Sequence, residues 1–138
     1  VLGIIEGFRP DTLYCPSMVE LNPDHRATAA LSMEIQKVRL EEKKDMPSLR
    51  IAFYEVTTPL RPNALVDITS AYRKKRNAIK CYRSQLKLKD YMGHITALNT
   101  VRRLTVEGPR YVEAFWFVQG PLKADDITKW LSFELAAP

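Results

Sequence analysis

Strand-like and helix-like segments alternate along this chain, and this alternation restricts its fold more than any other feature. Segments rich in β-branched and aromatic residues lie at 12–15, 50–56 and 111–118. Between them, apolar residues recur at helical spacing over roughly 22–45, 67–89 and 91–106. Strands that alternate with helices are typical of a sheet covered by helices. We therefore predict an α/β fold, a Rossmann-like three-layer sandwich whose three visible strands make an incomplete sheet.

The first long helix has a clear start signal. Asn22 suits the N-cap, Pro23 the first helical position, and Asp24 the positive end of the helix dipole. The apolar spacing predicts that one face of this helix is buried, with Ala27, Ala30, Leu31, Ile35 and Val38 on it. Residues 57–63 contain two prolines and are expected to form a loop, and Asp125 or Asp126 is expected to cap a last short helix through Leu131.

Length and composition indicate one globular domain. The chain has 138 residues, of which 46% are apolar and 27% charged. Its longest uninterrupted apolar runs have five residues, whereas a membrane span needs roughly 18 to 20. Cys15 and Cys81 give neither a disulfide framework nor zinc-ribbon spacing, so we interpret them as two small buried residues in a reducing compartment. We therefore expect a cytoplasmic protein.

The chain begins without methionine, on a segment that looks like the end of an amphipathic helix, Val1 to Phe8. We therefore expect residues 1–138 to be the C-terminal part of one longer domain. An absent N-terminal half would leave a large apolar surface on one side of the sheet.

The segment between the first strand and the first long helix is the best candidate for a site. Ligands of open α/β sheets bind where strands end and helices begin. His25 lies there in the first helical turn, and a neutral imidazole is a good ligand for a transition metal, with Asp24 as a carboxylate that would fix its tautomer. From spacing alone, however, a helix cap explains the motif better than a metal ligand, because no second histidine, cysteine or carboxylate stands at ligand spacing from His25. The other histidine, His94, lies within a predicted helix and is interpreted as a surface or packing residue.

The order of several short blocks resembles the LmbE-like, or PIG-L, de-N-acetylase superfamily. That family has a strand followed by His-Pro-Asp-His-Arg-Ala, and this chain has a strand followed by Asn22-Pro23-Asp24-His25-Arg26-Ala27. Further blocks agree in order, namely Arg9 to Pro16, Phe53 to Val56 with Pro59, Asp67 to Thr69 followed by Lys75, Ala78-Ile79, Cys81-Tyr82 and Ser84-Gln85, and Glu113 to Phe115.

The resemblance implies a zinc-dependent hydrolase that removes an N-acetyl group from an N-acetylglucosaminyl or related amino-sugar substrate. His25 matches a zinc ligand of the family, and Asp24 would orient it. The other ligands come from an Ala-His-Pro-Asp-Asp-Glu block that this chain lacks, so we expect them in a preceding segment and expect the chain alone to be inactive.

The chain also departs from the family motif. Asn22 replaces a histidine that is thought to polarise the substrate carbonyl, and an amide can donate a hydrogen bond there but cannot deliver a proton. Loss of such a donor costs on the order of 10² to 10³ in rate. Arg26 or Glu20 would compensate on the substrate side, and Arg50 is assigned to a polar wall of the site from its place at a strand end.

A strongly basic window supports a second class of function. Residues 71–89 hold eight basic and no acidic side chains, whereas the rest of the chain holds 13 basic and 16 acidic ones. One basic helix would bind nucleic acid through phosphates, but no RNP, KH or zinc-finger motif supports this partner. A third alternative is a non-catalytic carbohydrate-binding relative.

Lys75, which interrupts the apolar stripe of this helix, either extends its stem along the surface or reaches an acidic residue of the site. An oligomer is compatible with all of these functions.

Overall fold

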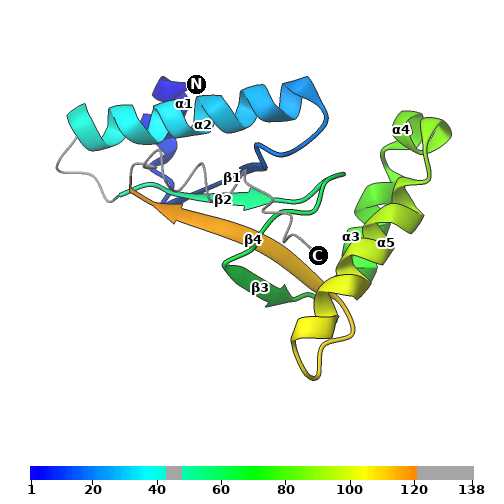
Figure 1. The fold of residues 1–138 in the computed structure, drawn as a ribbon. Coiled ribbons are helices and arrows are strands. Elements are labelled where there is room, and N and C mark those ends of the chain that lie inside the picture. The colour runs from blue at the N-terminus through cyan, green and yellow to red at the C-terminus, as the bar shows by residue number, and fades with distance from the viewer. Residues whose placement is uncertain (43–47, 121–138) are drawn as a thin grey trace, which may run out of the picture.

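The computed structural model describes residues 1–42 and 48–120 (Figure 1). In chain order its elements are α1 (Leu2–Phe8), β1 (Thr12–Pro16), α2 (Pro23–Glu42), β2 (Arg50–Tyr54), β3 (Ala64–Asp67), α3 (Tyr72–Lys80), α4 (Arg83–Leu88), α5 (Tyr91–Arg102), the 3-10 turn η1 (Arg103–Thr105) and β4 (Val112–Gln119). The helix predicted near 125–131 and the last predicted residues of the first long helix, 43–45, lie outside the described residues.

One four-stranded mixed sheet organises the molecule, in the order β1-β2-β4-β3. β1 and β2 are parallel, with Cys15 opposite Phe53, and β4 is antiparallel to both β2 and β3. The predicted α/β class is confirmed. β3 was not predicted, because it is a short edge strand whose last two residues are exposed, so its sequence lacks the alternation of a half-buried strand.

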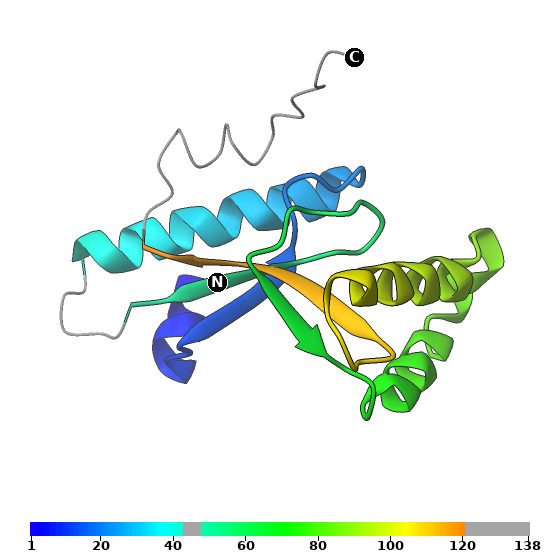
Figure 2. The same ribbon diagram turned by 60° about the horizontal axis from the view of Figure 1, so that its bottom comes forward.

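α2 covers one face of the sheet (Figure 2). The main core contains Cys15, Ala29, Ile51, Phe53, Leu60 and Val118. The face predicted for this helix is only partly right, because Ala27, Ala30 and Leu31 are exposed. The buried positions are Ala29, Ser32, Ile35, Gln36 and Arg39.

The polar members of that buried face are held by hydrogen bonds. The Gln36 amide donates to the carbonyls of Leu49 and Val118, at 2.7 and 3.3 Å. Arg39 donates to the carbonyl of Pro10 at 2.9 Å. A prediction from apolar spacing misses a face of this kind, because polar groups with partners can be buried at little cost.

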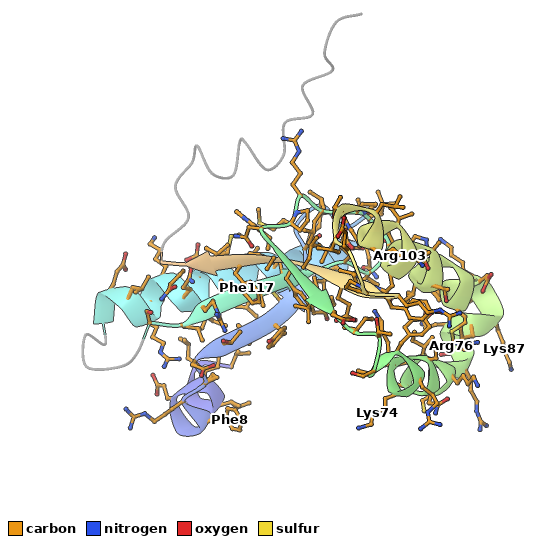
Figure 3. The ribbon with its side chains drawn as sticks, turned by 90° about the horizontal axis from the view of Figure 1, so that it is seen from below. Phe8, Lys74, Arg76, Lys87, Arg103 and Phe117 are labelled. Atoms are coloured by element: carbon orange, nitrogen blue, oxygen red, sulfur yellow. The ribbon has the colours of Figure 1, made fainter. Side chains whose placement is uncertain are left out.

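The other face of the sheet is aromatic. Tyr14 is 58% exposed and meets the Phe115 ring edge-on, with ring centroids 5.9 Å apart. Phe117, labelled in Figure 3, stacks on Phe115. The Arg50 guanidinium lies 4.7 Å from the Phe117 ring centre. Of these three rings only Tyr14 is exposed, because Phe115 is buried and Phe117 half-buried. Exposed apolar side chains also occur on α1, which packs beside α2 through Ile5 and Ile35, and there Ile4 and Phe8 are 76% and 81% exposed.

Helices α3, α4 and α5 gather at the end of the sheet where β4 begins (Figure 1). The sequence predicted one continuous basic helix that begins at residue 67, and this prediction is wrong. α3 begins at Tyr72, and the chain turns at Cys81 before α4. Like charges three or four residues apart, such as Lys80 and Arg83, disfavour a continuous helix, and α4 has no buried residue to offset them. No helix among residues 1–42 and 48–120 has the length and apolar character needed to cross a membrane.

Cys15 is buried as predicted, but Cys81 is exposed at the turn between α3 and α4. Burial raises the pKa of the Cys15 thiol to about 11, against a smaller opposing effect of its hydrogen bond with Ser32. Cys15 is therefore a protonated core thiol at neutral pH.

Candidate functional site

His25 lines a cavity at the carboxyl ends of the parallel strands β1 and β2. The chain leaves β1 at Pro16 and enters α2 at Pro23, which places His25 in the first turn of that helix with its side chain 26% exposed. The cavity has a volume of about 380 Å³ and is lined by His25, Tyr54, Glu55, Val56, Lys75, Ile95, Leu98, Asn99, Glu113, Ala114 and Phe115.

Glu20 anchors the loop that forms one wall of this cavity. Its carboxylate is buried, and it accepts hydrogen bonds from the backbone N–H groups of Val56, Thr57 and Thr58 at 2.8 to 3.2 Å and from the Thr57 hydroxyl at 2.5 Å. Burial by itself would raise the pKa of Glu20, but these hydrogen bonds outweigh it and hold the pKa below its ordinary value. Both carboxylate oxygens are occupied in this way, so Glu20 is a loop anchor with no oxygen left for a substrate.

The same carboxylate lies beside His25. Nδ1 of His25 is buried, has no hydrogen-bond partner within the described residues, and lies 3.6 Å from Oε2 of Glu20. At this separation the two groups interact electrostatically without a hydrogen bond.

Glu20, and not Asp24, is the carboxylate that lies beside His25. The Asp24 side chain is exposed and makes no hydrogen bond or ion pair within residues 1–42 and 48–120. Adjacent residues on a helix point in different directions, so the carboxylate next to His25 in sequence is not its neighbour in space.

Asn22 and Arg26 both stabilise the start of α2. The Asn22 side-chain oxygen accepts from the Asp24 backbone N–H at 2.8 Å, as expected of an N-cap. The Arg26 guanidinium donates to the carbonyls of Glu20 and Leu21, at 2.9 and 2.7 Å, and so ties the loop to the helix. The Asn22 amide group is exposed beside His25 in sequence, so its assignment as a hydrogen-bond donor to substrate remains a prediction.

Arg50 lies at the wrong end of the sheet for a wall of this cavity. It begins β2, whereas the cavity is reached at Tyr54, four residues further along the strand and about 13 Å away. Its guanidinium donates to the Thr12 hydroxyl at 3.1 Å and stacks on Phe117. The prediction placed Arg50 at an end of a strand but did not take account of which end. Arg50 is at the N-terminal end of β2, whereas His25 lies near the C-terminal end.

A polar triad that the sequence did not predict forms the opposite wall. Lys75 of α3 donates to the Asn99 side-chain oxygen of α5 at 2.9 Å and pairs with Glu113 of β4 at 2.5 Å. Asn99 is buried and also donates to the Val112 carbonyl. Lys75 therefore reaches an acidic residue of the site. This was one of the two explanations given above for a lysine within the apolar stripe of the basic helix. The pairing itself could not be predicted, since its three members come from distant segments.

A second ion pair lies at the edge of the cavity, which Glu55 lines. Glu55 bonds to the Arg102 guanidinium and accepts from the Leu60 backbone N–H at 2.9 Å. His94, by contrast, is a half-buried residue of α5 that does not line the cavity, in agreement with its interpretation as a packing residue.

His25, the metal ligand expected from the sequence, lines the cavity. Within residues 1–42 and 48–120, no group of three or more His, Cys, Asp or Glu side chains is arranged to hold a metal ion. A complete metal centre would need further donors from outside these residues.

Comparison with known proteins shows the fold. No family model matches the chain, and no curated protein matches it by sequence. Similar solved structures are GalB, the 4-carboxy-2-hydroxymuconate hydratase of Pseudomonas putida KT2440 (20% identity, TM-score 0.66), a conserved protein of Thermus thermophilus (21%, 0.71) and the N,N'-diacetylchitobiose deacetylase of Pyrococcus horikoshii in complex with an inhibitor (21%, 0.65).

These similarities cover 88%, 99% and 97% of this chain but only 57%, 60% and 53% of the three solved chains. The chain thus spans somewhat more than half the length of the proteins whose fold it shares. At the level of the fold, the similarity to a chitobiose deacetylase agrees with the resemblance drawn from the sequence blocks.

Proposed function

We propose that this chain is part of a zinc-dependent N-deacetylase that acts on an N-acetylglucosaminyl or related amino-sugar substrate. The observation that carries the proposal is the placement of His25 in the cavity at the carboxyl ends of the parallel strands, with Nδ1 3.6 Å from the buried Glu20 carboxylate. The motif around His25 and the chitobiose deacetylase among the similar structures support the same chemistry.

In this proposal each residue of the cavity has a separate task. His25 would hold the zinc ion through Nε2, and a bound zinc ion supplies Lewis-acid polarisation of the substrate carbonyl. Glu20 keeps the imidazole in the correct tautomer and fixes the loop from Val56 to Thr58. Asn22 would donate a hydrogen bond to the carbonyl oxygen. Lys75, held by Glu113 and Asn99, would donate to a sugar hydroxyl.

The test uses the protein expressed with whatever residues precede Val1 in its gene. Metal analysis is expected to find about one zinc per chain, and acetate is expected to be released from an N-acetylglucosamine derivative. His25→Ala should lose both the metal and the activity, whereas His94→Ala, which removes a histidine outside the cavity, should keep both. Full activity of His25→Ala would refute the proposal.

The residue at position 22 gives an independent measurement. The resemblance places a histidine at this position, so Asn22→His is expected to raise kcat by 10-fold or more, on the order of the effect of one oxyanion donor. An unchanged or lower kcat, with zinc content preserved, would show that Asn22 does not contact the reacting carbonyl.

Hydration of an unsaturated acid is the second candidate, since a hydratase has the same fold at nearly the same TM-score, 0.66 against 0.65. The two activities have different products. Acetate release supports the deacetylase, and water addition without acetate release would favour the hydratase.

A further inference from the structure

A second cavity, separate from the one lined by His25, lies along the outer face of α3. Its volume is about 450 Å³, and its lining includes four basic side chains, Arg73, Arg76, Lys80 and Arg110, and no acidic one. All four are exposed or half-buried. We refer to these four residues and the space between them as the basic cleft.

The fold brings the four cations together from two segments. Arg73, Arg76 and Lys80 are spaced three and four residues apart and therefore share one face of α3. Arg110 comes from the loop before β4, and the Thr69 hydroxyl accepts from the backbone N–H groups of Arg110 and Tyr111, at 2.9 and 3.2 Å. The loop that carries Arg110 is thus tied to the chain just before α3.

Two stacked aromatic rings form part of the wall of the cleft. The rings of Tyr72 and Tyr111 stack with centroids 3.5 Å apart and an angle of 12° between their planes. Tyr72 is buried, and its hydroxyl donates to Thr96 at 2.7 Å. The Arg110 guanidinium lies 5.5 Å from the Tyr111 ring centre, so one of the four cations packs against this stacked pair.

The charges of the cleft are not neutralised within the described part of the chain. None of the four basic residues makes an ion pair there. Glu107 and Glu113, each three residues from Arg110 in sequence, do not line the cleft, and Glu113 pairs with Lys75. Like charges at helical spacing disfavour α3 by a few tenths of a kcal/mol per pair. A bound anion would remove this repulsion.

We propose that the basic cleft binds the phosphate group of a small molecule. Guanidinium groups present forked donors that match phosphate oxygens, and three of the four cations are arginines. A small ligand is favoured over a nucleic-acid strand, because the remaining basic residues of the window do not line the cleft and one of them, Lys75, is paired with Glu113. Of these residues, Lys74 of α3 and Lys87 of α4 are labelled in Figure 3. This proposal does not depend on the function proposed for His25.

Calorimetric titration of the purified protein with inorganic phosphate at low salt tests the proposal. One saturable site per chain is expected. Arg76→Ala should weaken phosphate binding about 10-fold or more, as expected for the loss of a charge-assisted hydrogen bond. Arg76→Lys keeps the charge but removes the fork, and should give an intermediate loss. The matched control is Lys87→Ala, which removes one positive charge outside the cleft and should change binding less than twofold.

Three results would overturn the proposal. The first is the absence of saturable phosphate binding. The second is an equal loss for Arg76→Ala and Lys87→Ala, which would indicate diffuse attraction only. The third is binding of oligothymidylate without binding of phosphate, which would favour a nucleic-acid partner. His25→Ala should leave phosphate binding unchanged, so failure here and failure of the deacetylase proposal are separable.

Discussion

Glu20 offers the sharpest test of how the cavity is built, through the substitution Glu20→Gln. The two side chains have the same shape, but the amide replaces one carboxylate oxygen by an N–H₂ group. Oε1 accepts from three backbone N–H groups, at 2.8, 3.1 and 3.2 Å, and Oε2 accepts from the Thr57 N–H and hydroxyl, at 3.0 and 2.5 Å. The amide oxygen can replace only one of them.

The expected loss of stability follows from these contacts. The amide oxygen would replace Oε1, which has more partners, and the amide nitrogen would replace Oε2. The amide N–H₂ group and the Thr57 N–H are both donors, so the hydrogen bond between Oε2 and this N–H would be lost. The remaining bonds would change from charge-assisted to neutral. A hydrogen bond to a charged group contributes about 1.5–3 kcal/mol and a neutral one about 1 kcal/mol, so we expect a decrease of about 2–4 kcal/mol in the free energy of unfolding.

Urea denaturation followed by circular dichroism measures this difference. Glu34→Gln is the matched control, since Glu34 is a residue of α2 outside the buried core, and it should change stability by less than about 0.5 kcal/mol. If Glu20→Gln destabilises the protein no more than Glu34→Gln, Glu20 does not anchor the loop and the argument for the His25 tautomer fails with it.

Acid provides a second measurement on the same pair of proteins. The folded pKa of Glu20 lies below its ordinary value of 4.5. The stability that the ionised carboxylate contributes is therefore complete above about pH 4.5 and is lost as the pH falls through the folded pKa. Glutamine does not titrate, so the stability difference between the two proteins should shrink below pH 4.5. A constant difference from pH 7 to pH 3 would contradict this interpretation.

Three further predictions concern single residues. Cys81 should react with an alkylating reagent in the native protein at neutral pH, whereas Cys15, whose thiol pKa is raised to about 11 by burial, should react only after unfolding; mass spectrometry of the labelled peptides separates the two. Asn22→Ala should lower the free energy of unfolding by about 1 kcal/mol through loss of the helix cap, and Asn22→Asp should restore most of it; a loss for Asn22→Asp equal to that for alanine would exclude the capping role. Gln36→Leu should cost about 1–3 kcal/mol by leaving two buried carbonyl groups without their donor, as measured by urea denaturation, and a neutral result would mean that those carbonyls have other partners.

The parts of the fold that the sequence predicted depend on local signals. The Asn22 cap with Pro23, and the apolar β-rich segments of β1, β2 and β4, are visible in short windows because the forces that form them act between near neighbours. β3 and the buried face of α2 were missed for the opposite reason. Gln36 is buried only because Leu49 and Val118, at distant positions, offer it two carbonyl groups.

The same distinction explains which site residues were found. His25 was found because its position in a first helical turn after a strand is a local property. Its orienting partner was assigned to Asp24, the nearest carboxylate in sequence, but Glu20 has that position because it is first fixed by the loop from Val56 to Thr58, more than 30 residues away. Lys75 and Glu113 likewise meet only when α3 folds against β4.

The geometry of Glu20 links folding to the chemistry proposed for His25. The Glu20 carboxylate and the His25 imidazole are 3.6 Å apart, so their interaction is weak. A carboxylate that was free to move could therefore leave the imidazole at little cost. Glu20 cannot move in this way, because any displacement would break hydrogen bonds to three consecutive residues of the loop. The loop therefore fixes the carboxylate that lies beside His25, and we propose that this contact orients the imidazole. A substitution such as Thr57→Val, which removes one donor to Oε2 without touching His25, should for this reason weaken any metal held by His25 as well as the fold. Metal affinity that stays unchanged while stability falls would separate the two roles and show that the imidazole is oriented by something other than Glu20.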